Sequence, residues 1–231
     1  MCGRATMTLA AEDLAAQLGL PLDALPADYQ PRYNIAPTQE FLILREHHEQ
    51  LELMGSKWGL VNSWEKDAKS AGKHINARAE SLATNRAFRE AFSHHRCIVP
   101  VDGFYEWSGD RKARQPFWFH RPGGEILRLA GLYEWWQPRP GEWQSTFSIV
   151  TTGANGVIGR IHDRMPVILS EESAGEWIFE GEKDPGRLLK LLVPAPEDLL
   201  VPRAVLPRVN SANEEDAGLM DEAPGVQLSL V

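Results

Sequence analysis

The second residue of this chain is a cysteine, and its position allows a chemistry that no internal cysteine has. Removal of Met1 leaves Cys2 with a free α-amine and a thiol on one residue, a 1,2-aminothiol. An internal cysteine lacks this pair because its nitrogen belongs to a planar amide. An aldehyde can form an imine with the amine and then take the sulfur onto the same carbon, closing a five-membered thiazolidine. The chain therefore begins with a candidate trap for an aldehyde, although a small second residue is also common in ordinary proteins.

Two other residues have the chemistry to move protons around such a trap. Glu106 stands among aromatic residues in Gly103–Trp107, where loss of water raises the pKa of a carboxyl group and prepares it for proton transfer. The alternative is a carboxylate that points to water at a strand edge. His162 is the other, because histidine is the side chain most easily used as an acid or base at neutral pH, but a lone histidine more often has a structural partner. An α-amine titrates at about 7.7 to 8.0 and a thiol at about 8.5, so we expect Cys2 to need only modest help.

Other polar residues are candidates for binding. Asn76, Arg78 and Glu80 alternate, so an extended chain places them on one side, facing either solvent or a site. Thr151 and Thr152 open a segment whose backbone N–H groups offer a place for a phosphate. These residues indicate, but do not by themselves identify, a ligand.

The net charge of −8 argues at first against a nucleic-acid partner, but the charge is uneven. Residues 165–231 hold thirteen Asp and Glu against five Lys and Arg, whereas residues 1–164 hold nineteen of each. A basic surface on the first two thirds is therefore compatible with the composition. Eight arginines are available for it, although some would simply lie on solvated faces: Arg4, Arg32, Arg78, Arg86, Arg89, Arg96, Arg160 and Arg164.

The elements that must position these residues read as a single α+β domain. Runs of apolar and β-branched residues between Gly- and Pro-rich turns predict a mainly antiparallel sheet or a barrel-like body with short flanking helices. Residues 62–73 are expected to form a loop on which Trp64 either anchors the loop or, if exposed, stacks on a nucleobase. The expected strands are 41–44, 51–58, 96–101, 103–107, 117–120, 127–136, 146–151 and 201–206. The expected helices are 9–18, capped by Thr8 and ended by Gly19, 81–92, 171–179, capped by Ser170, and 186–192. The polar stretch 211–225 is expected to be loose.

The sequence contains no pattern for a metal, a cofactor or a membrane. Two cysteines fit a reducing compartment, and Cys97 lies in a strand-like run typical of a core residue. No Cys and His spacing suits zinc, and no glycine-rich loop of the nucleotide-binding type occurs. Because these patterns are missing, we expect no metal or cofactor. Neither a long apolar run nor a secretion signal is present, so we expect a cytoplasmic protein.

Six segments taken together resemble the SRAP family, the SOS response-associated peptidases. They are Met1–Arg4, Tyr33–Gln39, Asn76–Glu80, Arg96–Pro100, Gly103–Trp107 and Ile161–Pro166, and Ala130–Trp135 and Val209–Asn210 are also similar. The resemblance covers about residues 2–210. It implies one α+β domain over residues 1–210, followed by a polar C-terminal tail over residues 211–231. Ala5 departs from the pattern, since an aromatic residue is common there, and Pro207–Arg208 replaces a small pair.

The resemblance implies a sensor of abasic sites in single-stranded DNA that crosslinks itself to them. An abasic sugar opens to an aldehyde, the electrophile that a 1,2-aminothiol traps. In single-stranded DNA the sugar need not be pulled from a duplex. The implied roles are catalytic for Cys2, Asn76, Glu106 and His162, and DNA-binding for Arg4, Arg78, Trp64, Trp107, Thr151, Thr152 and Arg164.

The resemblance also implies further activities and a setting. The family name implies a peptidase that cuts its own Met1–Cys2 bond, and an imine at Cys2 would permit weak strand cleavage by β-elimination. The expected partner is single-stranded DNA with abasic sites, bound by a monomer that joins the nucleoid after damage.

Two other functions fit part of the sequence. Glutamine amidotransferases also begin Met-Cys-Gly and use the α-amine as the base of an N-terminal nucleophile, so a glutaminase assay separates that class. A non-catalytic reader of single-stranded or modified DNA would bind equally well after Cys2→Ala.

Overall fold

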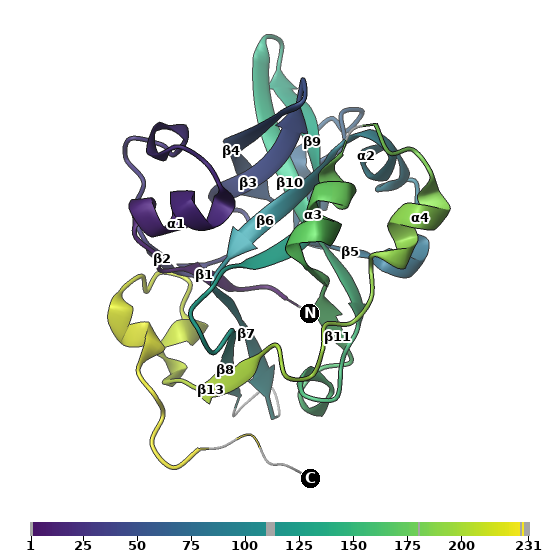
Figure 1. Cartoon of the computed structure of the whole chain (residues 1–231). Helices are drawn as coiled ribbons and strands as arrows, with labels where there is room; N and C mark the ends of the chain where they lie inside the picture. Colours follow the sequence, from purple (N-terminus) through teal and green to yellow (C-terminus); the bar gives the residue numbers. More distant parts are fainter. Residues whose placement is uncertain (1, 110–113, 180, 227, 229–231) are drawn as a thin grey trace.

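A computed structural model describes residues 2–109, 114–179, 181–226 and 228, and its largest feature is a closed barrel. Strand β10 pairs with β4 on one side and with β9 on the other, so the five strands β4–β3–β6–β9–β10 form a complete circuit (Figure 1). Most neighbours are antiparallel, while β10 runs parallel to β4 and to β5. The barrel strands are β3 Glu40–His47, β4 Gln50–Trp58, β6 Arg96–Val101, β9 Leu127–Arg139 and β10 Glu142–Gly153. The predicted α+β fold with a barrel-like body is confirmed.

Short strands extend this barrel where β10 and β9 run beyond it. Strands β5 and β11 pair with the end of β10, and β12 pairs with β9. Their bounds are β5 Asn76–Arg78, β11 Arg164–Pro166 and β12 Ile168–Leu169. Residues widely separated in the sequence therefore meet along one end of β10.

A second sheet of five strands holds the N-terminal strand in its interior. Its order is β13–β8–β7–β1–β2, so β1 lies between β7 and β2. Figure 1 shows β1 and β2 beneath the barrel, with β7, β8 and β13 below them. The bounds are β1 Ala5–Met7, β2 Arg32–Ile35, β7 Gly103–Ser108, β8 Gln115–His120 and β13 Val201–Ala204. This order places β1, which directly follows the N-terminal residues, in the interior of the second sheet.

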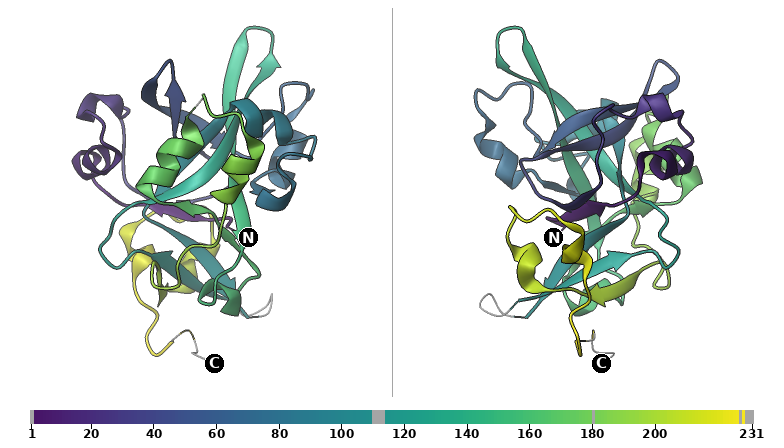
Figure 2. Two further views of the ribbon diagram at one scale, coloured as in Figure 1. Left: turned by 45° about the vertical axis from the view of Figure 1, so that its right-hand side comes forward. Right: turned by 90° about the vertical axis from the view of Figure 1, so that its left-hand side faces the viewer.

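Short helices cover the outside of the barrel, with α1 on one side and α2, α3 and α4 on another (Figures 1 and 2). Ser170 caps α3 as predicted, because its side chain accepts a hydrogen bond from the Ser173 N–H. Within the described residues no helix is long and apolar enough to cross a membrane. The α-helices are Ala11–Leu18, Arg89–His94, Glu171–Ile178 and Pro185–Lys190, and 3-10 helices span Leu22–Ala24, Ala68–Lys73, Ala79–Ser81, Ile158–Arg160, Pro207–Asn210 and Ala217–Met220.

Two helix predictions are wrong in part. Thr8 does not cap α1, because its hydroxyl donates to Asp102. The helix begins at Ala11, and Ala10 is its N-cap residue. Gly19 does end α1, with a φ of 68° in the left-handed region that glycine favours. The helix predicted over 81–92 is mostly turns, because the side chain of Asn85 accepts from the Ala87 N–H in competition with helical hydrogen bonds.

The stretch predicted to be loose is instead held to the second sheet up to residue 223. The carboxylate of Glu215 accepts hydrogen bonds from two backbone N–H groups of β2, and Leu219 and Ala223 are buried. Figure 1 shows this yellow segment beside β2 and β13. The polar composition of the segment predicted solvent contact, but its acidic side chains find donors on the protein.

Candidate active site

The strand that leads to Cys2 is fixed by a buried carboxylate. Asp102, 4% exposed, accepts hydrogen bonds from the Thr6 hydroxyl and from both the hydroxyl and the backbone N–H of Thr8, the last at 2.6 Å. Ala5 pairs with Phe104 of β7 on one side. These contacts set the position at which the N-terminal residues leave β1.

Cys2 itself is fully buried and meets a strand of the other sheet. The Asn76 side chain donates from Nδ2 to the Cys2 carbonyl oxygen at 2.9 Å. Asn76 Oδ1 is buried and has no hydrogen-bond partner among the described residues, so one acceptor at the site is unused.

Burial raises the pKa of the Cys2 thiol, and the nearby charge of Glu106 raises it further. The surroundings of Cys2 therefore disfavour the thiolate, and the modest activation predicted for the chain without Met1 stays a prediction. Met1 lies outside the described residues.

Glu106 lies in the interior rather than at an exposed strand edge. Its residue is 3% exposed on β7, where it pairs in register with Phe117 of β8. Burial raises the pKa of the Glu106 carboxyl group, and the proximity of His162 opposes that shift. The predicted desolvation of this carboxyl group is confirmed.

His162 lies near Glu106 and turns one ring nitrogen toward its own chain. Its Nδ1 accepts from the Arg164 N–H at 3.0 Å and is also 2.9 Å from an oxygen of Asp163. One nitrogen cannot accept and donate in the same tautomer. The Asp163 side chain is 84% exposed and competes with water, whereas the backbone N–H is fixed by β11, so we assign Nδ1 as acceptor. The proton of the neutral ring then sits on Nε2.

Arg164 is engaged by a carboxylate at the rim. Its guanidinium donates to both oxygens of Glu80, at 2.6 and 3.0 Å, and to the Thr151 carbonyl oxygen at 2.6 Å. The hydrogen bond from Arg164 lowers the pKa of Glu80. A planar guanidinium holds a carboxylate in the same two-point manner in which it holds a phosphate.

The phosphate-holding role predicted for the segment after Thr151 stays a prediction, and part of this segment is used within the fold. Thr151 and Thr152 are buried within β10 and pair with β11. The next N–H groups are also used, since Ala154 donates to Asp163 and Asn155 to the sulfur of Met165. The N–H groups of Ala154 and Asn155 are thus already used within the protein.

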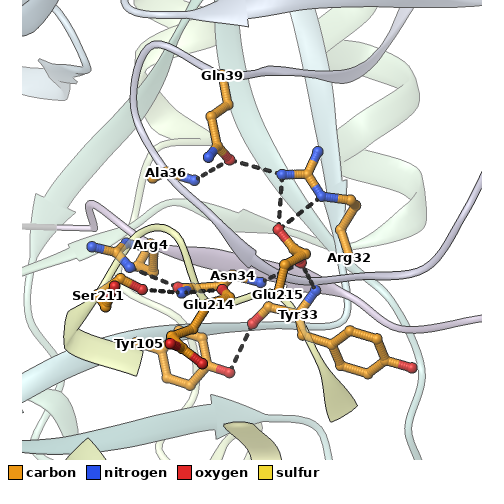
Figure 3. Close-up of polar contacts among 10 residues, drawn as sticks. All are labelled: Arg4, Arg32, Tyr33, Asn34, Ala36, Gln39, Tyr105, Ser211, Glu214 and Glu215. Carbon is orange, nitrogen blue, oxygen red and sulfur yellow. Dashed lines mark hydrogen bonds and ion pairs between the residues drawn. The ribbon is translucent and has the colours of Figure 1, made fainter. Parts of the chain in front are cut away.

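Arg4 and Trp107 lie together, and both contact a loop near the end of the chain. Figure 3 shows Arg4 beside Ser211 and Glu214 of this loop. Arg4 Nη1 donates to Asn34 Oδ1 at 2.7 Å and to the Val209 carbonyl oxygen at 2.9 Å. The guanidinium lies 5.9 Å from the centre of the Trp107 ring, whose Nε1 donates to Asn210 Oδ1 at 2.6 Å.

The remaining predicted residues differ in their exposure. Arg78 is exposed on β5, two residues after Asn76. Trp64 is 48% exposed, and the Arg86 guanidinium lies 5.6 Å from its ring centre, so it is not a buried anchor. Arg96 is no surface residue, because it is buried and donates to five backbone carbonyl oxygens, including those of Phe92 and Trp177.

The structure thus gathers the four predicted catalytic residues around the N-terminal segment and adds residues that sequence reasoning missed. No spacing in the sequence marks the additions, because each acts through a partner far along the chain. Within the described part of the chain, no group of three His, Cys, Asp or Glu side chains is arranged for a metal ion. The additions are Asn34, Asp102, Asn210 and Glu215.

Comparison with known proteins gives one consistent family. Residues 1–212 match the family model described as SOS response associated peptidase (SRAP). The chain is 37% identical over 222 residues to the abasic site processing protein YoaM of Bacillus subtilis, covering 96% of this chain and 98% of the relative. It is 36% identical over 181 residues to the abasic site processing protein YedK of Escherichia coli, covering 77% and 79%. A crystal structure of a protein from Bacteroides thetaiotaomicron superposes with a TM-score of 0.84 at 25% identity, covering 96% of this chain and all of that one.

Proposed function

This chain belongs to the SOS response associated peptidase family, and on that premise we propose that it captures abasic sites in single-stranded DNA as a thiazolidine on Cys2. The relatives YoaM and YedK are abasic site processing proteins, which supports this substrate. The observation that carries the proposal is the meeting of Cys2 with Asn76, Glu106 and His162 from three separate parts of the chain.

The chemistry follows from the two groups on one residue. After Met1 is removed, the α-amine adds to the aldehyde carbon of the opened sugar and water leaves, which forms an imine. The Cys2 sulfur then adds to that carbon while its proton passes to the nitrogen, so a C–S bond joins the C–N bond and the C=N double bond is lost. Neither oxidant nor cofactor is needed.

The surroundings of Cys2 suit this order of steps. Because burial raises the pKa of the thiol, the amine is the first nucleophile in this proposal, and the sulfur follows once the electrophilic imine is beside it. Glu106 takes the proton from the ammonium group, and its raised pKa supports this role because it makes the carboxylate a stronger base. His162 donates from Nε2 to the sugar oxygen as the ring opens. Asn76 positions Cys2 through its carbonyl and offers Oδ1 to a sugar hydroxyl.

DNA binding falls to residues around Cys2. Arg4, Arg78 and Arg164 meet phosphates flanking the abasic site, and Arg164 does so after exchanging Glu80 for a phosphate. Trp64 and Trp107 meet unstacked bases, since both leave part of the ring in contact with solvent. The protein acts as a monomer.

Two secondary activities belong to the same proposal. Cleavage of the Met1–Cys2 bond by the chain itself would expose the amine. An imine that loses the 3′ phosphate by β-elimination instead of closing to the ring would give weak strand cleavage. Both depend on Cys2, so neither requires another site.

A single-stranded oligonucleotide with one abasic site tests the proposal. We expect the mature protein to form an adduct that survives denaturing electrophoresis, and Cys2→Ala to abolish it. Cys97→Ala is the matched control, because this second cysteine is buried in the core and should leave capture intact. An adduct that persists in Cys2→Ala refutes the proposal, and equal binding without any adduct indicates a non-catalytic reader.

A further inference from the structure

A loop close to the end of the chain is built into the strand region that carries Cys2. Figure 3 shows Asn34 of β2 at the centre of the connection. Asn34 is fully buried, its Oδ1 accepts from Arg4 Nη1 at 2.7 Å, and its Nδ2 donates to the carbonyl oxygens of Ser211 and Glu214 at 2.9 and 2.8 Å. One side-chain amide thus joins an arginine of the N-terminal segment to the loop.

The chemistry of this position requires an amide. A guanidinium donor faces one end of the side chain, and two carbonyl acceptors face the other. Asparagine accepts at one end and donates twice at the other, whereas aspartate only accepts and leucine does neither. Asn34→Asp would therefore keep the contact with Arg4 and lose both contacts with the loop.

The contacts of Arg4 leave part of its guanidinium for a ligand. Nη1 is held from the protein side by Asn34 and by the Val209 carbonyl oxygen. Nη2 has no hydrogen-bond acceptor among the described residues, and the side chain is partly exposed. The arrangement fixes the direction of the guanidinium while it leaves donors unused.

Trp107 is oriented by the same loop. Its only polar atom, Nε1, donates to Asn210 Oδ1 at 2.6 Å, next to Val209 in sequence. The Arg4 guanidinium lies over the ring. The indole therefore has one preferred rotation about its attachment to β7, with part of the ring exposed.

The loop is anchored without help from a ligand. Glu215 pairs with Arg32 at 3.0 Å and accepts from the N–H groups of Tyr33 and Asn34, the latter at 3.0 Å (Figure 3). These N–H groups lie on the open edge of β2, the last strand of its sheet. The loop thus has a fixed position from which to hold Arg4 and Trp107.

We propose that Asn34 and Asn210 are positioning residues for DNA binding, which hold the Arg4 guanidinium for a phosphate and the Trp107 ring for a base of single-stranded DNA. This inference rests on the proposed function, because it takes the ligand from there. The loop 207–215 thereby takes part in the DNA site, although no side chain of this loop needs to contact DNA.

The salt dependence of binding to an undamaged single-stranded oligonucleotide tests the role of Asn34. Loss of one phosphate contact reduces the slope of log Kd against log salt concentration by about 0.7 for single strands. We expect Arg4→Ala, Asn34→Ala and the double variant each to show this same loss, because Asn34 acts through Arg4. Asn213→Ala, an exposed amide in the same loop, should bind like wild type.

Two further measurements separate positioning from general destabilisation. Thiazolidine formation with a small aldehyde, which needs no DNA contact, should keep its wild-type rate in Asn34→Ala and Asn210→Ala. If Asn34→Ala does not fold, Asn210→Ala tests the positioning role on its own. Asn210→Ala should weaken oligonucleotide binding in the wild-type background. It should have no effect in Trp107→Phe, because phenylalanine lacks the N–H that Asn210 accepts from.

The outcomes distinguish the inference from the proposed function. Three results would overturn the positioning role while leaving capture intact. The first is a wild-type salt slope in a folded Asn34→Ala, and the second is a double variant whose slope falls by twice the single-variant loss. The third is equal weakening of binding by Asn210→Ala in the wild-type and Trp107→Phe backgrounds. If wild-type protein neither binds the oligonucleotide nor forms an adduct with its abasic form, the proposed function fails and the inference fails with it.

Discussion

Two five-residue segments of this protein have nearly the same sequence and different surroundings. Gly103–Trp107 on β7 and Gly131–Trp135 on β9 differ only in their second residue, and each buries its glutamate almost completely, at 3% exposure for Glu106 and 4% for Glu134. Local sequence therefore determines that a strand carries a buried carboxyl group. Local sequence does not determine which residues that carboxyl group contacts.

The partners from other elements make the difference. Glu134 accepts a hydrogen bond from His95 Nδ1 at 2.7 Å, and its neighbour Tyr133 accepts from the buried Arg45 at 3.1 Å, so this cluster joins β9 to β3 and to the end of α2. Glu106 instead lies close to Cys2 and His162, where burial dominates and raises its pKa. One strand pattern therefore gives a carboxyl group with structural partners in the barrel and, under the proposed function, a proton-transfer group beside the N-terminal segment.

The largest expected difference is in capture. Glu106→Gln keeps the size of the side chain but cannot take a proton, so we expect the rate of adduct formation to fall by about 10²- to 10⁴-fold. Single-turnover kinetics with an abasic oligonucleotide measure it. Glu134→Gln is the matched control, and an equal loss in both variants would erase the distinction between the two segments.

Stability should show the opposite pattern. Glu134→Gln replaces a charge-assisted hydrogen bond with a weaker one, and we expect the free energy of unfolding to fall by about 1 to 3 kcal/mol. Urea unfolding measures it. Glu106→Gln should not lower stability at neutral pH, since it removes a carboxyl group that is costly to bury in its charged form.

The pH dependence of stability sharpens the comparison. A carboxyl group whose pKa is raised on folding favours the folded state fully below its unfolded pKa, near about 4.3, and loses that contribution as pH rises through the folded value. Wild type should therefore lose stability relative to Glu106→Gln across this window, by at most about 1.4 kcal/mol per pH unit. A difference that is constant with pH contradicts the raised pKa of Glu106.

The smallest expected effect concerns a third carboxylate, Glu80, which is exposed at the rim of the site and paired with Arg164. Glu80→Gln removes the anion that competes with phosphate for this guanidinium. The side chain of Glu80 is 58% exposed, so the pair is worth only about 0.2 to 1 kcal/mol, and binding of single-stranded DNA should tighten a few-fold at most. Weaker binding would show that Glu80 positions Arg164 rather than competes for it.

Sequence patterns predicted the parts of this protein that depend on local periodicity. The barrel strands, the capped helix after Ser170 and the burial of Glu106 follow from alternation, capping chemistry and aromatic neighbours. The grouping of Cys2 with Asn76, Glu106 and His162 came from resemblance to a family, because no periodicity relates four residues on different strands and loops.

Long-range partners account for what the sequence did not predict. Thr8 has the chemistry of a helix cap, but Asp102 offers its hydroxyl a buried carboxylate. Glu215 lies in a polar segment typical of a loose tail, yet it meets the open edge of β2. In each case the residue type allowed two partners, and only the three-dimensional arrangement selects one.

The most direct test of the whole account is peptide mapping of the adduct by mass spectrometry. Wild-type protein is reacted with an abasic oligonucleotide, the DNA and protein are digested, and the modified peptide is fragmented. We predict a peptide that begins at Cys2, lacks Met1 and carries the sugar on both the α-nitrogen and the sulfur. An adduct on a lysine, or on a chain that retains Met1, would contradict the central claim.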